Sequence, residues 1–155
     1  MNLSEILTER VIKVDLEAED KFEAIEELID LLISEHEISL RNRDEILETV
    51  FKRESSISTG VGNGVAIPHG TVDCIDDIVG ALGVSPEGIN FESFNGEPVY
   101  IVVILLVPKL KISRHIKTLA QIARIMNNTD VTTAIRSARS PEALFRLIEK
   151  IERDM

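Results

Sequence analysis

The amino-acid sequence predicts a single α/β domain over residues 1–155, because segments with helical periodicity stand before, between and after segments typical of strands. A length of 155 residues suits one domain. The composition, 44% hydrophobic and 28% charged, is ordinary for a globular protein. A formal charge of −10 argues against duplex nucleic acid as the main partner and instead suits a basic protein.

The first part of the chain predicts one strand and two helices. Residues Arg10–Leu16 are rich in β-branched side chains and indicate a strand. Asp20 is expected to cap a helix over Lys21–Ser34, with Glu23 completing a capping box. A second helix is expected at about Asn42–Arg53. The predicted buried faces of the two helices comprise Phe22, Ile25, Leu28, Ile29 and Leu32, and Ile46, Leu47, Val50 and Phe51.

The middle of the chain predicts a loop and three extended segments. A loop of small residues covers Glu54–Gly64 and leads into Val65–Ile67, which Pro68 and His69 close. Two further strands are expected at Ile78–Val84 and Val99–Val107. The latter is apolar on both faces, which predicts a central strand of the sheet, whereas two glycines in the former weaken its strand signal.

The last third predicts three helices. Ser113 is expected to cap the first, whose inward face would be Ile116, Leu119, Ala120, Ala123 and Met126. Asp130 starts a short helix through Ala138. Ser140, followed by Pro141 at the first helical position, begins the last helix. Its predicted inward residues are Leu144, Leu147, Ile148 and Ile151.

Several function classes are disfavoured by simple features. The longest strongly apolar run has nine residues, whereas a helix needs about 20 to cross a bilayer. The N-terminal residues lack the pattern of a signal peptide, so we expect a cytoplasmic protein. A single cysteine, Cys74, excludes an internal disulfide and a multi-cysteine metal site. Acidic neighbours should raise the pKa of this thiol, so we expect it to serve packing rather than nucleophilic chemistry.

Histidines are the strongest candidates for chemistry. His36 lies among acidic residues and is expected to be a solvated surface side chain. His69 follows a proline, a short apolar segment and a glycine-rich loop, a setting where backbone N–H groups approach anions. His115 falls in the first turn of the helix expected after Ser113, where anions are favoured. The pattern alone favours a plain exposed first-turn residue for His115.

Other nucleotide and metal sites match less well. The GVGNG segment at 60–64 resembles half of a dinucleotide-binding fingerprint, but Pro68 follows where a helix should start. The Gly-Lys-Ser/Thr of a Walker loop is absent. A zinc site would have to combine His69, Cys74, His115 and a carboxylate at no recognised spacing. No metal and no cofactor are therefore predicted.

Taken together, Arg53-Glu54, Ser58-Thr59-Gly60 and GNGVAIPHG at 62–70 form a specific motif. VVILLVP at 102–108 and HIKTLAQIARIM at 115–126 extend it. Over nearly the whole chain the sequence resembles the type 2 enzyme IIA domains of the bacterial phosphoenolpyruvate-dependent sugar phosphotransferase system. This family includes fructose- and mannitol-specific IIA components and nitrogen-regulatory IIA proteins.

The resemblance implies a mixed, roughly five-stranded sheet flanked by helices on both faces. It also implies that His69 accepts a phosphoryl group from the histidine-containing phosphocarrier protein and passes it to a IIB component. His115 and Arg53 would support the site without being phosphorylated. The phosphate-binding residues expected around them are Ser58, Thr59, Gly60, Gly62 and Ser113.

These residue types suit phosphoryl transfer. Neutral imidazole is a good nucleophile near pH 7. The transition state spreads charge over three oxygens, so the protein mainly positions and neutralises, and an arginine fork is suited to that task. Two function classes stay open: a phosphotransferase component that relays phosphate during sugar transport, and a nitrogen-regulatory type whose phosphorylation state selects its partners.

Overall fold

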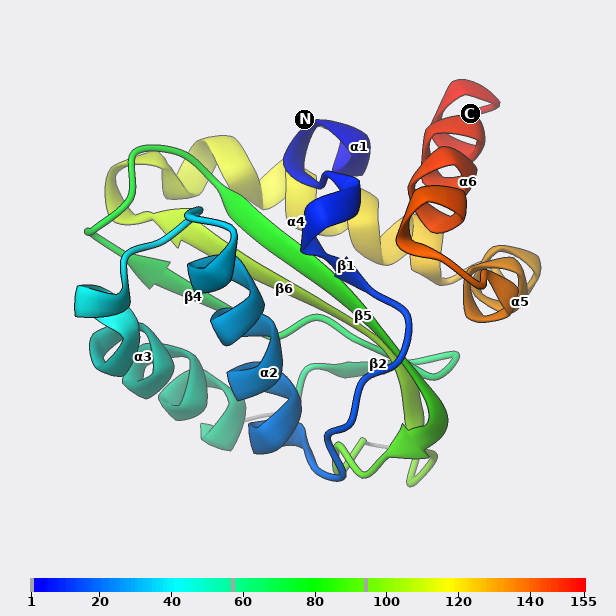
Figure 1. Cartoon of the computed structure of the whole chain (residues 1–155), viewed down its shortest axis with the longest axis horizontal. Coiled ribbons are helices and arrows are strands. Elements are labelled where there is room, and N and C mark those ends of the chain that lie inside the picture. Colours follow the sequence, from blue (N-terminus) through cyan, green and yellow to red (C-terminus); the bar gives the residue numbers. More distant parts are fainter. Residues whose placement is uncertain (1, 57, 94) are drawn as a thin grey trace.

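The hydrophobic core is built on one mixed β-sheet with helices on both of its faces (Figure 1). The structure is a computed structural model, and it describes residues 2–56, 58–93 and 95–155. The helices are α1 (Leu3–Ile6), α2 (Lys21–Ser34), α3 (Arg43–Ser56), α4 (Ile112–Met126), α5 (Thr129–Ser137) and α6 (Pro141–Arg153). The strands are β1 (Ile12–Lys13), β2 (Gly60–Gly62), β3 (Val65–Ala66), β4 (His69–Val72), β5 (Val79–Ile89) and β6 (Val99–Pro108). Short 3-10 turns cover Glu9–Val11, Leu40–Asn42 and Lys109–Lys111.

Strand β6 is the centre of the sheet, as its apolar sequence predicts. It pairs antiparallel with β5 on one side and parallel with β3 and β4 on the other. β3 and β4 keep one register along β6, with Val65 opposite Ile101 and His69 opposite Leu105. They therefore occupy one strand position interrupted by two residues. In the described part of the chain, six strands fill five positions in the order β1-β5-β6-β3/β4-β2. This confirms the expected mixed sheet.

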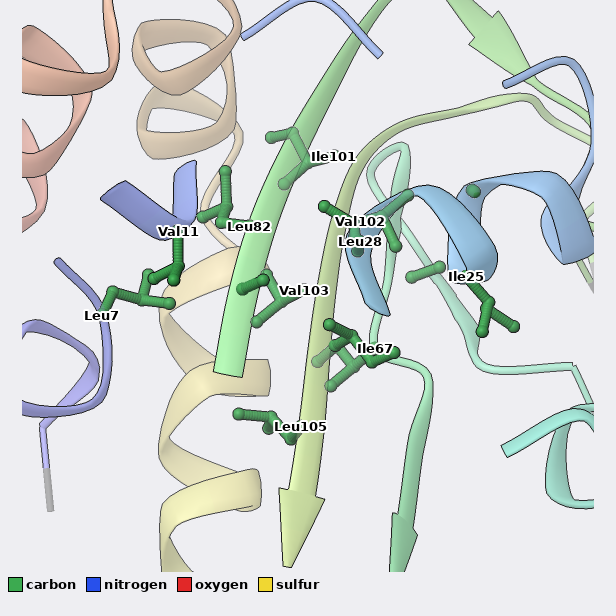
Figure 2. Close-up of a cluster of buried hydrophobic side chains, with 14 of the residues drawn as sticks. Leu7, Val11, Ile25, Leu28, Ile67, Leu82, Ile101, Val102, Val103 and Leu105 are labelled. Carbon is green, nitrogen blue, oxygen red and sulfur yellow. The ribbon is translucent and has the colours of Figure 1, made fainter. Parts of the chain in front are cut away.

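The two faces of the sheet carry different helices. α2 and α3 cover one face, and α4 lies behind the sheet in the same view (Figure 1). Figure 2 shows Leu28 of α2 beside Val102 on one side of β6. Leu7 and Val11 lie beside Leu82 of β5 on the other side. Because successive strand residues point to opposite faces, alternate residues of β5 and β6 supply both halves of the core.

Helix α2 has the predicted bounds. The side chain of Asp20 accepts a hydrogen bond from the backbone N–H of Glu23, as a helix N-cap does. Four of the five predicted core residues of α2 are buried, but the prediction for Phe22 is wrong, since it is 37% exposed. Its ring meets the half-buried Phe51 of α3 edge-to-face, with 5.2 Å between ring centroids. The two rings pack together at the contact between α2 and α3.

Helix α3 ends about one turn later than predicted, which shortens the expected loop. It continues to Ser56, so Glu54 is helical and buried. Strand β2 then takes up part of the remaining loop. Ile57, also within the predicted loop, lies outside the described residues.

Three extended segments also differ from expectation. Only Ile12 and Lys13 of the predicted strand 10–16 enter the sheet, because a 3-10 turn precedes them and a bend at Val14 and Asp15 follows them. β5 continues past Val84 to Ile89 after a register shift. His69 does not close the strand before it but opens β4.

The C-terminal helices confirm the predicted architecture with shifted details. α4 begins at Ile112 with Lys111 at its N-cap, so Ser113 lies within the first turn and does not cap the helix. The predicted inward face of α4 is also wrong for Ile116, which is 56% exposed, and for Ala120, which is exposed too. The buried residues of α4 are His115, Thr118, Ile122, Ile125 and Met126. α5 starts one residue before Asp130, and the hydroxyl of Ser140 caps α6 as predicted.

Candidate functional site

His69 is held within the sheet by main-chain pairing. It lies opposite Leu105 of β6, in the row of the sheet that also contains Gly80 of β5. A Cβ atom added to the next residue, Gly70, would lie 3.2 Å from side-chain atoms of Thr49 in α3. Since neighbouring side chains alternate, that of His69 points to the opposite face, the one α4 covers.

The ring of His69 is fixed by its own chain. Its Nδ1 atom lies 2.9 Å from the carbonyl oxygen of Ile67. A carbonyl oxygen can only accept, so Nδ1 carries the hydrogen and donates it. In the neutral ring Nε2 then holds the lone pair, and it has no hydrogen-bond partner among the described residues. This leaves a half-buried ring with its nucleophilic nitrogen available.

His115 is buried rather than exposed. Its side chain is only 2% exposed, so the interpretation as a plain exposed first-turn residue is wrong. Its Nε2 atom lies 3.2 Å from Oδ1 of Asp77. Its other nitrogen, Nδ1, is buried and has no partner within the described part of the chain. Because α4 covers the face to which His69 points, both histidines belong to the same face of the sheet.

The carboxylate of Asp77 is itself held in place. Its Oδ1 atom accepts the backbone N–H of Ile78 at 2.8 Å. This hydrogen bond, with help from the positive charge of Lys111 and from His115, lowers the pKa of Asp77 below its ordinary value. Asp77 therefore stays ionised at neutral pH and presents an acceptor to His115.

Arg53 lies in the last turn of α3, beside the segment that carries His69. One turn earlier, Thr49 lies over Gly70. One residue later, Glu54 bonds Thr59, whose carbonyl accepts the N–H of Ile67. The helix thus passes along residues 67–70, and the half-buried Arg53 is level with them.

The predicted phosphate-binding loop is anchored inside the protein. The hydroxyl and the N–H of Thr59 both donate to the buried carboxylate of Glu54, the latter at 3.0 Å. The hydroxyl of Ser58 donates to the carbonyl of Phe91 and accepts the N–H of Gly60. A phosphate would have to compete with these bonds, so their role in binding one stays a prediction.

Gly62 and Ser113 have open surroundings. Gly62 has φ +94°, in the left-handed region that favours glycine, and an added Cβ would meet nothing within 4 Å. Ser113 is exposed in the first turn of α4, two residues before His115. Its hydroxyl does not cap the helix. Both also remain predicted phosphate contacts.

Cys74 and His36 behave as structural or surface groups. Burial raises the pKa of the Cys74 thiol, and the charges of Glu45 and Asp73 add to the shift. The direction confirms the prediction, although burial is the main cause. His36 is exposed, as expected. In the described ranges, no group of three or more histidine, cysteine or acidic side chains is placed to hold a metal ion, and no helix is long and apolar enough to cross a membrane.

Asp77 and Glu54 are the site residues whose contacts sequence reasoning missed. Asp77 is 38 residues from His115, and only the sheet and α4 bring the two together. Glu54 follows Arg53 directly in the sequence motif, which was a signal for its importance. Its burial was not predicted, because a charged residue at the end of a helix is normally exposed.

Comparisons with known proteins point to one family. The family model described as "Phosphoenolpyruvate-dependent sugar phosphotransferase system, EIIA 2" matches residues 5–151. A nitrogen regulatory protein of Bradyrhizobium diazoefficiens is 31% identical over 96% of this chain and 95% of its own length. The PTS system fructose-specific EIIABC component of Bacillus subtilis is 27% identical over 97% of this chain, which spans only 23% of that protein.

Solved structures show the same fold. The nitrogen regulatory protein IIA-Ntr from Neisseria meningitidis matches with a TM-score of 0.86 and 32% identity, over 94% of this chain and 98% of that one. Enzyme IIAMTL, solved in complex with phosphorylated enzyme IIBMTL from Escherichia coli, matches with a TM-score of 0.77 over 93% and 97% of the chains. At 20% identity the latter shows the fold alone. The match to the family model over nearly all residues establishes that this chain belongs to the EIIA 2 family of the phosphoenolpyruvate-dependent sugar phosphotransferase system.

Proposed function

We propose that His69 accepts a phosphoryl group from the histidine-containing phosphocarrier protein and passes it to a IIB component in the cytoplasm. The observation that carries this proposal is the hydrogen bond from Nδ1 of His69 to the carbonyl of Ile67. It leaves Nε2 as the attacking atom. The P–N bond of the donor breaks as the bond from phosphorus to Nε2 forms, while the hydrogen stays on Nδ1 and remains hydrogen-bonded to the carbonyl of Ile67.

The surrounding residues have supporting roles in this proposal. Arg53 offers a planar set of donors for the three phosphoryl oxygens, which carry the charge of a loose transition state. His115 lies on the same face and has one ring nitrogen unpaired within the described residues. No step requires a metal or a cofactor. Support for a IIB acceptor comes from the shared fold with IIAMTL, which is solved together with its phosphorylated IIB partner.

A second candidate is a nitrogen-regulatory type, in which phosphorylation of His69 selects the bound partner. The observation in its favour is the pattern of identities. Two nitrogen regulatory proteins, one of them of solved structure, have 31% and 32% sequence identity to this chain over nearly their whole lengths. The fructose-specific relative has 27% sequence identity, and the match covers only 23% of its own length. Both candidates use the same chemistry at His69.

The test is phosphorylation by phosphoenolpyruvate, enzyme I and the phosphocarrier protein, read by intact mass and acid lability. We expect one acid-labile phosphate in the wild type and none in His69→Ala, with the circular dichroism spectrum unchanged. The matched control is His36→Asn, because asparagine tolerates the positive φ of 61° at this exposed position. It should be labelled like the wild type. Equal labelling of His69→Ala would refute the assignment.

A second experiment separates the two candidates. The phosphorylated protein is mixed with purified IIB components, and the phosphate on each is followed by mass. Transfer to a IIB component supports the relay. A phosphate that stays on His69, together with a partner bound by only one of the two forms, supports the regulatory type.

A further inference from the structure

We propose that Asp77 is a positioning residue for His115 and that it fixes which ring nitrogen of His115 faces the phosphoryl group on His69. The inference rests on the proposed function for its kinetic consequence. Its structural part, the assignment of the ring hydrogen, stands on the contacts of Asp77 alone.

The geometry makes Nε2 of His115 a donor. Oδ1 of Asp77 is 3.2 Å from that nitrogen and accepts the N–H of Ile78 at 2.8 Å. An ionised carboxylate has no hydrogen to give, so the hydrogen in the contact belongs to Nε2. The backbone bond also prevents the carboxylate from turning away, although the Asp77 side chain is 55% exposed.

The second nitrogen then points inward without a partner. Nδ1 of His115 is buried and makes no hydrogen bond to any described residue. A buried polar atom without a partner is rare in native proteins and calls for an explanation. A phosphoryl group on His69 supplies one, because its oxygens can bond a protonated Nδ1 while the carboxylate of Asp77 stabilises the imidazolium.

The sheet register brings these groups to one end of the molecule. Asp77 stands two residues before Val79, which pairs with Leu106 of β6. His69 pairs with the adjacent residue, Leu105. The α4 helix follows β6 after one 3-10 turn and so returns His115 to the same end.

Three variants test the inference. Asp77→Ala removes the acceptor. Asp77→Asn keeps an oxygen that can accept the N–H of Ile78, but it loses the negative charge. Asp76→Ala, at the exposed neighbouring position, changes the net charge as Asp77→Ala does, and among the described residues the hydrogen bond and ion pair of His115 are to Asp77 and not to Asp76. Each is measured for the rate of phosphoryl uptake and for ring ¹⁵N shifts, which distinguish protonated from bare nitrogens.

We expect Asp77→Ala to slow uptake about tenfold, the scale of one orienting hydrogen bond, and to mix the two neutral forms of the ring. Asp77→Asn should retain the wild-type form of the neutral ring but lose part of the rate, because its neutral amide no longer stabilises the imidazolium by charge. Asp76→Ala should match the wild type. With only three histidines in the chain, His36→Asn and His69→Ala assign the spectrum.

The inference is overturned by a wild-type rate in Asp77→Ala, or by a hydrogen on Nδ1 in the neutral wild-type ring. Loss of the ring form in Asp77→Asn as complete as in Asp77→Ala would also overturn it. The spectra are recorded on unphosphorylated protein. If the wild type took up no phosphate, the proposed function would fail while the assignment of the ring hydrogen would still be decided.

Discussion

The two histidines of the site are oriented by different kinds of group. His69 is held by a main-chain carbonyl two residues before it, which no side-chain substitution removes. His115 is held by the side chain of Asp77. The nucleophile therefore depends on the backbone conformation around Ile67, whereas the supporting histidine depends on a single carboxylate.

At the residue scale, we expect Arg53→Ala to slow phosphoryl uptake roughly a hundredfold, the typical effect of removing one transition-state donor. Arg53→Lys should recover part of the rate, because an ammonium supplies charge without the planar fork. The measurement is rapid-quench transfer with peptide mapping, and the phosphate should remain on His69. Lys52→Ala, an exposed neighbour, is the control. Unchanged kinetics in Arg53→Ala would remove Arg53 from the mechanism.

The principal residues of the candidate site could be named from the sequence, but not their partners. His69, His115 and Arg53 lie in motifs that are local in the chain. The contact of Asp77 with His115 arises only when the start of β5 and the first turn of α4 meet. No local pattern predicts that meeting, because sheet register links distant segments.

At the element scale, the last turn of α3 anchors the chain that leads to the site. The buried carboxylate of Glu54 accepts two hydrogen bonds from Thr59. We expect Glu54→Ala to lower the free energy of unfolding by about 1–3 kcal/mol, since it leaves buried donors without a partner. Urea unfolding measures this loss. Glu48→Ala, exposed on the same helix, should have little effect, and an equal loss in both variants would contradict the assignment.

Elements were predictable where their signals are local. The cap and apolar spacing of α2 gave both of its bounds. α4 was misplaced because a 3-10 turn over Lys109–Lys111 leads into the helix before Ser113. Glycine weakened the strand signal of β5, yet a Cβ added to Gly83 would lie 2.6 Å from Leu16, so close packing excludes a side chain there.

At the scale of the whole molecule, the two ends of the chain are joined. The backbone N–H groups of Leu3 and Ser4 donate to the carboxylate of Glu152, at 2.7 and 2.9 Å. This contact ties α1 to α6, which Figure 1 shows near each other. Residues from the beginning and the end of the sequence therefore stabilise one structure.

We expect Glu152→Ala to lower the free energy of unfolding by about 1–2 kcal/mol, as the loss of a helix cap does, within a single cooperative transition. Thermal and urea unfolding followed by two probes measure both. Glu149→Ala, exposed one turn earlier, serves as the control. Separate transitions in the wild type would instead show that the ends fold independently.

The register of β4 has a consequence for how partner proteins would recognise a phosphorylated form. The strand opens at His69 beside the central strand, with α3 packed on one face. We expect a group attached there to leave the backbone where it is. What changes is the local charge, by about −1.5 to −2 at one point, and with it the electrostatic potential around the site. Partners would then discriminate between two nearly superimposable surfaces by attraction and repulsion, so the information resides in charge rather than in shape.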